Sequence, residues 1–433
     1  MKPIYIAILL FGFAPKMMSQ EVLSLEDAVK IALENNYEIR ISKNDLSIDK
    51  TNVTVGNAGM LPKLAANVLD NNSIQNTTQT RSDGTTTTLN NAKNNSLTYG
   101  VGLDWTVFDG FKMFAKYDQL KALQKLGEAE LKLTIITKIS DVTSTYYDLV
   151  QQQQQLSALD TTIVISNQRV TLAQNRFTIG KASKLEVLNA QVDLNTDTTT
   201  YLRQKELYAN TKTLLNQIMA RDVKTDFKVI DTIVVDSQLL LPELTSLAEK
   251  QNPQLETQVL NKKIAELQLK QVKADRYPVI AVNSAYNFTE SESSLGFVAQ
   301  SSGKGLNYGF TATLNLFDGF NQRRNEKVAK LLIDNANIAI EQQNQILHAT
   351  LMTSFQTYLT NLELRKLEDR NESIAKQNLD ITLEKFRIGI IPTIEFRTAQ
   401  LNYINAKVRN SNAQFQAKLS EIALKELAGN LTF

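Results

Sequence analysis

The sequence contains an internal repeat, and this repeat constrains the fold more than any other feature. The segment Phe108-Asp109-Gly110-Phe111 recurs 209 residues later as Phe317-Asp318-Gly319-Phe320. Upstream, Pro62 and Pro278 lie 216 residues apart, so the first copy carries 216 less 209, or seven, extra residues in between. The 209-residue spacing also matches Phe177 with Phe386, Gly180 with Gly389 and Glu186 with Glu395. Such regularity predicts one supersecondary unit that is built twice.

Each copy follows the same order of predicted elements. An amphipathic helix, expected at Ser24–Gly56 and again at Leu244–Arg276, precedes a β-hairpin, a long helix and a return helix. We expect the first repeat at residues 20–221, the linker at residues 222–241 and the second repeat at residues 242–433. The expected β-hairpins lie at about 62–108 and 278–317, the long helices at about 112–179 and 321–388, and the return helices at about 184–219 and 393–428.

The hairpins carry the period-two alternation of strands that have one apolar and one polar face. Each strand pattern is about ten residues long, near the length of a tilted membrane strand. The segments Asn71–Asn95 and Glu290–Lys304 are polar, as extracellular loops would be. A soluble sheet covered by helices would show the same alternation. The apolar positions are Tyr99, Val101, Leu103, Trp105 and Val107 in the first copy and Tyr308, Phe310, Ala312, Leu314 and Leu316 in the second.

The number of strands has a consequence if the strands lie in a membrane. Four strands in one chain cannot close a barrel, and an open strand edge is not tolerated in lipid. Small membrane barrels begin at about eight strands. The sequence therefore implies an oligomer whose chains share one barrel.

The expected long helices exceed what a globular domain uses. At about 1.5 Å per residue, each would reach roughly 100 Å. Their apolar residues recur at spacings of three and four, which is the spacing of coiled coils without strict heptads. A plain coiled-coil rod would explain these helices but not the strands. Helices with neighbours on two sides and water on the others suit the wall of a water-filled tube.

Composition excludes several classes of function. Cysteine is absent and His348 is the only histidine, so disulfides, thiolate metal sites and multi-histidine metal sites are excluded. Residues 1–19 read as a signal peptide. Without its lysines, Lys2 and Lys16, the 47 basic residues become 45 against 45 acidic ones, which gives no basis for nucleic-acid binding. No phosphate-binding loop or nucleophile motif is present, so we expect no cofactor, no metal and no enzyme activity.

The ordered set of motifs resembles the TolC-like outer membrane efflux protein family. The resemblance rests on the signal peptide, the duplicated helix–hairpin–helix–helix unit, Phe-Asp-Gly-Phe after each hairpin, and the segments Arg176–Gly180 and Lys385–Gly389. It implies a mainly α chain with a transmembrane β-barrel portion. Three chains would form a 12-stranded barrel that continues into a long periplasmic α-helical coiled-coil barrel. Residues 222–241, including the strand-like run Val229–Val235, would form part of an equatorial belt.

The same resemblance implies a function and its partners. The protein would be a homotrimer in the cell outer membrane, in contact with outer-membrane lipid and extending into the periplasm. It would act as the passive exit duct of a tripartite efflux pump or a type I secretion system. Its partners would be a periplasmic adaptor (membrane fusion) protein and an inner-membrane transporter of the RND, ABC or MFS type.

The resemblance places the functional tips at the breaks between long and return helices. Glu186 and Glu395 match an acidic pore-facing position in some family members, and either could line the gate. Ser183-x-x-Glu186 also reads as a capping box, so gating and capping both stay open for Glu186. Phe177 and Phe386 are pore candidates that favour packing at the tip over a constriction. The turns expected to dock the adaptor are Gly180, Lys181, Ala182 and Ser183 in the first copy and Gly389, Ile390, Ile391 and Pro392 in the second.

The family pattern is incomplete at the tips. The second acidic position of the family's gate is Asn189 and Thr398 here, and its basic position is Ile391. These departures put a salt-bridged latch of the family type in doubt.

The strand-to-helix junctions have a structural interpretation. Asp109 and Asp318 are expected to cap the long helices, and Gly110 and Gly319 to allow the bend. Two further functions were weighed against the exit duct. A periplasmic coiled-coil scaffold would have no barrel, and a glycan-active enzyme with Asp or Glu pairs would need a compact cleft.

Overall fold

The computed structural model describes residues 21–230, 232–294 and 298–431. The predicted signal peptide at residues 1–19 lies outside the described residues. The chain divides into two compact units. Unit 1 comprises Met1–Ile41, Leu133–Asn252 and Ile346–Phe433, and unit 2 comprises Ser42–Lys132 and Pro253–Gln345. Each unit therefore contains parts of both sequence copies.

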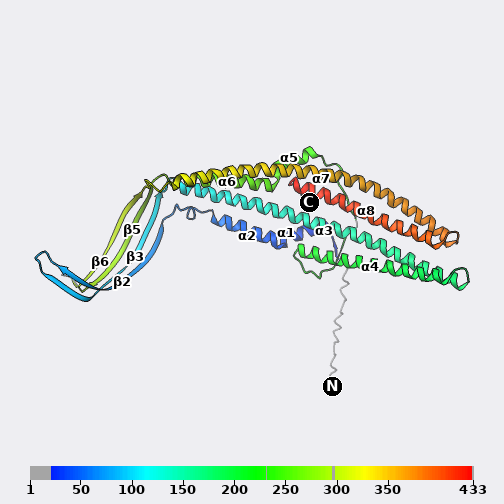
Figure 1. Cartoon of the computed structure of the whole chain (residues 1–433), viewed down its shortest axis with the longest axis horizontal. Helices are drawn as coiled ribbons and strands as arrows, with labels where there is room; N and C mark the ends of the chain where they lie inside the picture. The colour runs from blue at the N-terminus through cyan, green and yellow to red at the C-terminus, as the bar shows by residue number, and fades with distance from the viewer. Residues whose placement is uncertain (1–20, 231, 295–297, 432–433) are drawn as a thin grey trace, which may run out of the picture. The chain divides into compact units, whose positions relative to one another are not determined.

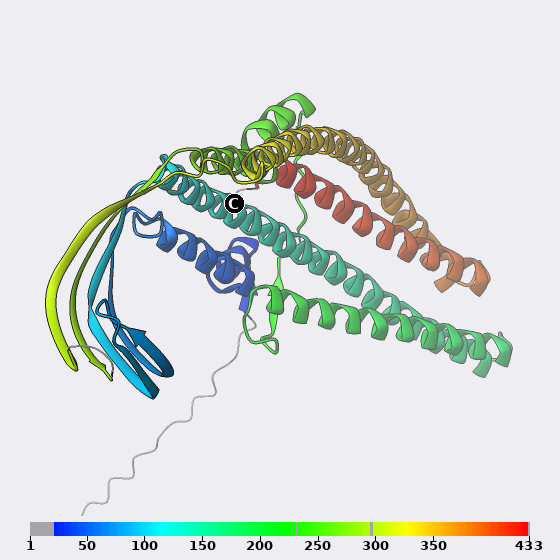
Figure 2. The same ribbon diagram turned by 60° about the vertical axis from the view of Figure 1, so that its left-hand side comes forward.

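Unit 2 contains a four-stranded antiparallel sheet. Its strands are β2 (Lys63–Thr80), β3 (Thr86–Phe108), β5 (Val279–Ser293) and β6 (Gln300–Thr313), in the order β2-β3-β5-β6. Figure 1 labels the four strands, and Figure 2 shows them as one curved sheet. The two hairpins thus lie side by side through β3 and β5, and β2 and β6 form the edges of the sheet.

The strands are longer than the alternation predicted. The expected loop Asn71–Asn95 is largely strand, because β2 and β3 stay paired as far as Thr80 and Thr86. Cross-strand threonine pairs hold this extension, with Thr78 and Thr88 hydroxyls 3.1 Å apart. Likewise, most of Glu290–Lys304 belongs to β5 and β6. Polar Thr and Asn side chains hid these strands, since neither face shows apolar alternation.

The first hairpin extends beyond the second. Asn94 pairs with Ser293 near the end of β5, whereas the β2–β3 ladder continues from Ile74 to Thr80. At about 3.3 Å per residue, this two-stranded ribbon projects roughly 20 Å further. The seven extra residues of the first copy lie in this ribbon and in its turn.

The amphipathic helices expected at Ser24–Gly56 and Leu244–Arg276 are each broken into two. The first becomes α1 (Leu25–Asn35) and α2 (Tyr37–Asn52), and the second becomes α5 (Leu241–Gln251) and α6 (Pro253–Ala274). The breaks fall at Asn36 and Asn252, which are equivalent positions 216 residues apart. The Asn36 side-chain oxygen accepts hydrogen bonds from the amides of Glu38 and Ile39, so it caps α2.

The same two asparagines bind the ends of the return helices. Asn36 donates from Nδ2 to the carbonyl of Ile218 at 2.7 Å, and Asn252 donates to the carbonyl of Leu427 at 3.0 Å. Ile218 and Leu427 are themselves 209 residues apart. The unpaired carbonyls at the two helix ends are therefore satisfied in the same way in both copies.

The long and return helices form at the predicted places. The long helices are α3 (Lys112–Thr178) and α7 (Asn321–Arg387), and the return helices are α4 (Lys184–Ile218) and α8 (Thr393–Leu427). These bounds agree with the expected ranges to within a residue. None of the helices in the described part of the chain has the length and apolar character that crossing a bilayer requires.

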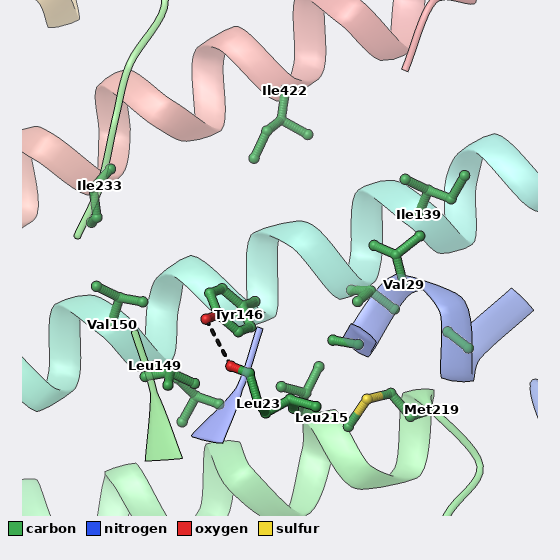
Figure 3. Packing of buried hydrophobic residues seen from close by; sticks show 14 of the residues in the cluster. Leu23, Val29, Ile139, Tyr146, Leu149, Val150, Leu215, Met219, Ile233 and Ile422 are labelled. Atoms are coloured by element: carbon green, nitrogen blue, oxygen red, sulfur yellow. Dashed lines mark hydrogen bonds between the residues drawn. The ribbon is translucent and has the colours of Figure 1, made fainter. Parts of the chain in front are cut away.

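The largest core lies in unit 1, where the linker crosses the helices. Strand β1 (Glu21–Leu23) pairs in parallel with β4 (Phe227–Val229). The buried Tyr146 of α3 donates from its hydroxyl to the carbonyl of Leu23 at 3.0 Å, as Figure 3 shows, and accepts from the amide of Ile230. The expected strand-like run Val229–Val235 contributes only its first residue to a strand. Leu215 and Met219 of α4 and Ile422 of α8 complete the core from other elements.

Candidate functional site

The turns between long and return helices have the same geometry in both copies. Gly180 and Gly389 adopt φ values of +72° and +80°, the left-handed conformation that favours glycine. Lys181 donates from its amide to the carbonyl of Arg176 at 2.8 Å, and Ile390 donates to Lys385 at 3.1 Å. With the bonds from Gly180 to Phe177 and from Gly389 to Phe386, each turn is a Schellman motif.

The turns expose apolar side chains to solvent. Ile179 and Leu185 flank the first turn, and Ile388, Ile390 and Ile394 lie at the second, all of them more than 60% exposed. Gly180, Lys181, Ser183, Gly389 and Pro392 are also exposed, whereas Ala182 and Ile391 are half-buried. Exposed apolar groups concentrated at one end of a helical hairpin mark an interaction surface.

Glu186 is held by contacts that the sequence did not indicate. The hydroxyl of Thr393 donates to Glu186 Oε1 at 2.7 Å, and Arg176 Nη1 lies 3.4 Å from the same oxygen. The capping-box interpretation is wrong, because Ser183 occupies the N-cap position of α4 but its side chain makes no capping hydrogen bond. Glu395, the equivalent of Glu186, lies exposed in the first turn of α8.

The two equivalent phenylalanines occupy different environments. Phe386 is 3% exposed and stacks on Phe396 with ring centroids 4.8 Å apart. Ile165 and Leu172 of α3 pack against the same cluster. Phe177, by contrast, is 40% exposed. Equal positions in the sequence copies therefore do not have equal roles in one chain.

A buried ionic network, which sequence reasoning missed, lies between the two helical hairpins. Arg397 of α8 places Nη1 and Nη2 each 2.8 Å from the carboxylate oxygens of Asp197 on α4. Its Nε lies 3.7 Å from Asp193, which also receives a hydrogen bond from Arg169 of α3. Arg169 is 1% exposed, and Arg397 and Asp197 are also buried. Charges removed from water in this way are stable only as long as each keeps its partner.

Neutral hydrogen bonds extend the same contact in both directions. Gln400 of α8 donates to the hydroxyl of Ser166 at 3.0 Å, and that hydroxyl donates to Asp197 at 2.6 Å. Further along, Gln155 of α3 donates to the Ser411 hydroxyl of α8 at 3.2 Å. The spacing of Asp193 and Asp197 at i and i+4 placed both acids on one helix face. Nothing in the sequence indicated that an arginine 200 residues away would meet them.

The strand-to-helix junctions confirm the predicted capping. Asp109 Oδ2 accepts from the Met113 amide at 2.9 Å, and Asp318 Oδ2 accepts from the Gln322 amide at 2.6 Å. Gly110 and Gly319 both have φ of +70°. The backbone bends at each junction through a left-handed glycine, so the bend is fixed by local residues.

Metal ligands are not grouped in this part of the molecule or elsewhere in the described chain. Among the described residues, no group of three or more His, Asp or Glu side chains is placed to hold a metal ion.

The chain matches a known family along both copies. The model of the outer membrane efflux protein family matches residues 28–221 and 244–430, which are the two repeats without their ends and linker. The outer membrane protein TolC of Escherichia coli (strain K12) is 19% identical over 440 residues, covering 99% of this chain and 86% of TolC.

Solved structures of outer-membrane channels have the same fold. The Campylobacter jejuni CmeC outer membrane channel superposes with a TM-score of 0.79 at 16% identity, over 94% of this chain and 85% of CmeC. The open-state Neisseria gonorrhoeae MtrE outer membrane channel gives a TM-score of 0.74 at 15% identity, over 94% and 89%. The expected fold class, a mainly helical chain with the β portion of such channels, is confirmed.

Proposed function

The chain belongs to the outer membrane efflux protein family, and on this premise we propose that it forms the passive exit duct of a tripartite efflux pump or a type I secretion system. Proteins of this family are outer-membrane channels that extend into the periplasm, so the chain is an efflux channel and not an enzyme. They act as trimers together with adaptor and inner-membrane transporter proteins. The proposal concerns which edges, tips and partners this chain uses.

The single observation that carries the proposal is the pair of unpaired sheet edges. Strands β2 and β6 have no neighbour on their outer sides within the described chain. An open edge in lipid leaves backbone donors and acceptors without partners, at a cost of several kcal/mol each. A trimer in which β6 of one chain pairs with β2 of the next removes all of these edges.

The duplication specifies the register of that pairing. Lys63 pairs with Asp104 in the first hairpin, and the equivalent residues Val279 and Thr313 pair in the second. The offsets of 216 and 209 residues therefore hold through the strands. Applied to the pairing of β3 with β5, they carry the pair Leu103 and Ser284 onto Ala312 of one chain and Val68 of the next.

This derived register passes an independent check. Side chains of Tyr308, Phe310 and Ala312 share one face of β6, and Leu64 and Val68 share one face of β2. The pairing of Ala312 with Val68 puts both apolar sets on the same face of the joined sheet. A slip by one residue would have placed them on opposite faces.

We propose that the exposed turns at Gly180 and Gly389 dock the periplasmic adaptor. Support comes from the isoleucines Ile388 and Ile390, which are 69% and 70% exposed beside a rigid Schellman turn. The transporter behind the adaptor, whether of the RND, ABC or MFS type, would supply the energy. The chain itself offers a path and no chemistry.

We also propose that Glu186 and Glu395 contribute acidic rings at the entrance. Both lie in the first turn after a tip, and a trimer would bring two carboxylates per chain to one end of the duct. Rings of acidic side chains favour cations. Replacing both by glutamine should lower the cation selectivity, measured from reversal potentials across a salt gradient in planar bilayers.

Cell fractionation and surface labelling test the proposed function. The protein should fractionate with outer membranes and run as a trimer in mild detergent. An epitope inserted at Gly84, in the turn of the β2–β3 ribbon, should label on intact cells, whereas one at Gly180 should not. A soluble periplasmic monomer, or labelling only at Gly180, would contradict the proposal.

A further inference from the structure

The two helical hairpins of one chain meet along a polar seam. Here the α8 residues Arg397, Gln400 and Ser411 bind side chains of α3 and α4 through hydrogen bonds and ion pairs. We call this contact the within-chain seam. Its central pair, Arg397 and Asp197, is bidentate and buried, so the two hairpins are joined by directional bonds that have one favourable geometry.

A ring of three chains contains a second kind of seam. If the proposed trimer is correct, and this inference rests on it, each second-copy hairpin also meets a first-copy hairpin of the next chain. The between-chain seam then consists of equivalent positions, found by adding 209 to first-copy residues and subtracting 209 from second-copy residues. The strand registers support this transfer, because they obey the same offsets.

The transfer replaces the ionic network by apolar residues. Asp197 and Arg397 become Ala406 of one chain and Leu188 of the next. The hydrogen-bonded pair Gln155 and Ser411 becomes Leu364 and Leu202. Near the tip, Thr393 and Glu186 become Lys184 and Glu395, an exposed pair that contributes little to stability.

Exposure in the single chain agrees with this assignment. Leu364 of α7 and Leu202 of α4 are 45% and 57% exposed. Ile374 and Ile381 of α7, also exposed, are the equivalents of Ile165 and Leu172, which pack against the second hairpin within the chain. The large exposed apolar side chains of these helices therefore coincide with positions that the duplication assigns to the between-chain seam.

We propose that Leu364, Ile374 and Ile381 of one chain pack against Phe177, Leu188 and Leu202 of a second copy, and that the periplasmic end opens along these between-chain seams. The two hairpins of each chain then move as one body. Separating the within-chain seam would strand the buried charges of Arg397 and Asp197. Apolar contact is not directional, so the between-chain seam can slide and repack during opening.

Paired cysteine bridges test the proposal at equivalent positions. The chain contains no cysteine, so introduced thiols have no competitors. Gln155→Cys with Ser411→Cys bridges the within-chain seam, and Leu364→Cys with Leu202→Cys bridges the between-chain seam. A short bifunctional methanethiosulfonate links each pair and is released by dithiothreitol. The readouts are the size of the product on gels and potassium conductance in planar bilayers.

The proposal predicts opposite behaviour of the two bridges. The Leu364/Leu202 bridge should give covalent trimers and lower the mean conductance at least tenfold, reversibly on reduction. The Gln155/Ser411 bridge should leave chains at monomer size on gels and conductance within twofold of wild type. If Gln155→Cys or Ser411→Cys impairs folding, Ser166→Cys with Gln400→Cys replaces that pair, matched by Ala375→Cys with Gln191→Cys between chains.

Two results would overturn the inference, and a third would reach further. Loss of conductance with the within-chain bridge would place opening within the chain. Intact trimers that fail to cross-link through Leu364 and Leu202 would refute the between-chain contact. A wild-type protein that is monomeric in mild detergent would instead refute the proposed function as well.

Discussion

The two sequence copies form the same framework but differ where they face each other. Asn36 and Asn252 break equivalent helices and bind equivalent carbonyls, and Asp109 and Asp318 cap equivalent helices. At the helical seam, by contrast, Arg397 stands where the first copy has Leu188. Duplication thus preserved the residues that shape each copy and let the contact surfaces diverge.

The largest expected effect comes from making the second copy resemble the first at this seam. Arg397→Leu should leave Asp197 without its main partner in a buried site, where losing one partner of an ion pair costs about 3–5 kcal/mol. The double variant Arg397→Leu with Asp197→Ala removes both charges and should recover much of that loss. Thermal unfolding followed by circular dichroism in detergent measures both.

The comparison would fail if the double variant were as unstable as the single one. Leu188→Ala is the matched control on the other copy, since it changes the equivalent position without stranding a charge. Equal losses for Arg397→Leu and Leu188→Ala would mean that the two seams do not differ in kind.

A second prediction concerns the glycines of the junctions. A methyl group on Gly110 would lie 2.4 Å from the carbonyl oxygen of Ala274, whereas on Gly319 its nearest neighbour is the Asn321 side chain at 3.7 Å. Both have left-handed φ, which costs a side chain about 1–2 kcal/mol. In one chain, therefore, Gly110→Ala should be the more damaging change.

Assembly should erase that difference. The offsets place Ala58 of the neighbouring chain against Gly319 as Ala274 lies against Gly110. Gly319→Ala should then weaken trimers to urea about as much as Gly110→Ala does, as measured by the fraction of trimer on size-exclusion chromatography. A trimer that tolerates Gly319→Ala alone would argue against equivalent junctions.

The helix breaks should respond alike in both copies. Asn36→Ala removes the cap of α2 and the partner of the Ile218 carbonyl, and loss of such a cap costs about 0.5–2 kcal/mol. Asn252→Ala should act similarly on the end of α8. Hydrogen exchange of the Glu38 and Ile39 amides should accelerate in Asn36→Ala and not in Asn252→Ala. Unchanged exchange at those amides would contradict the capping role.

The smallest expected effect is a pH dependence confined to one copy. Burial, together with the charge of Asp141, raises the pKa of the Glu426 carboxyl above its ordinary value, although Ser140 donates a hydrogen bond to it. The first copy has Gln217 at this position. Because the folded state then binds the proton more tightly than the unfolded state, stability falls as pH rises from about 4.3, the ordinary glutamate pKa, through the raised one.

Glu426→Gln should therefore stabilise the protein slightly at neutral pH and flatten its stability between those two pKa values. Denaturant titrations at several pH values measure this. A variant whose stability changes with pH as steeply as that of the wild type would show that Glu426 is not the group responsible.

Local patterns predicted much of the fold, because they are written in adjacent residues. The spacing of Gly180 and Gly389 located both turns, and the apolar periodicity located the long helices to within a residue. The breaks at Asn36 and Asn252 were missed, because the apolar pattern runs on across them. The polar ends of β2 and β3 were missed for the converse reason, since their Thr and Asn side chains alternate in no recognisable way.

The candidate site was less predictable from the sequence. Glu186 was correctly singled out near the tip, but its partner Thr393 lies 207 residues away. Arg397 and Asp197 look like ordinary surface charges in the sequence, and only the packing of two hairpins buries them together. Contacts between distant segments carry no local signal, whereas the duplication does predict which contacts have a counterpart between chains.

Cross-linking β2 to β6 tests the central claim most directly. The account places Ala312 of one chain opposite Val68 of the next, close enough for a disulfide across neighbouring strands. After oxidation, the variant Val68→Cys with Ala312→Cys should give covalent trimers in outer membranes, and the off-register variant Leu64→Cys with Ala312→Cys should give few. Absence of linked trimers from the first variant, or equal linking in both, would contradict a shared barrel built in the register of the duplicated hairpins.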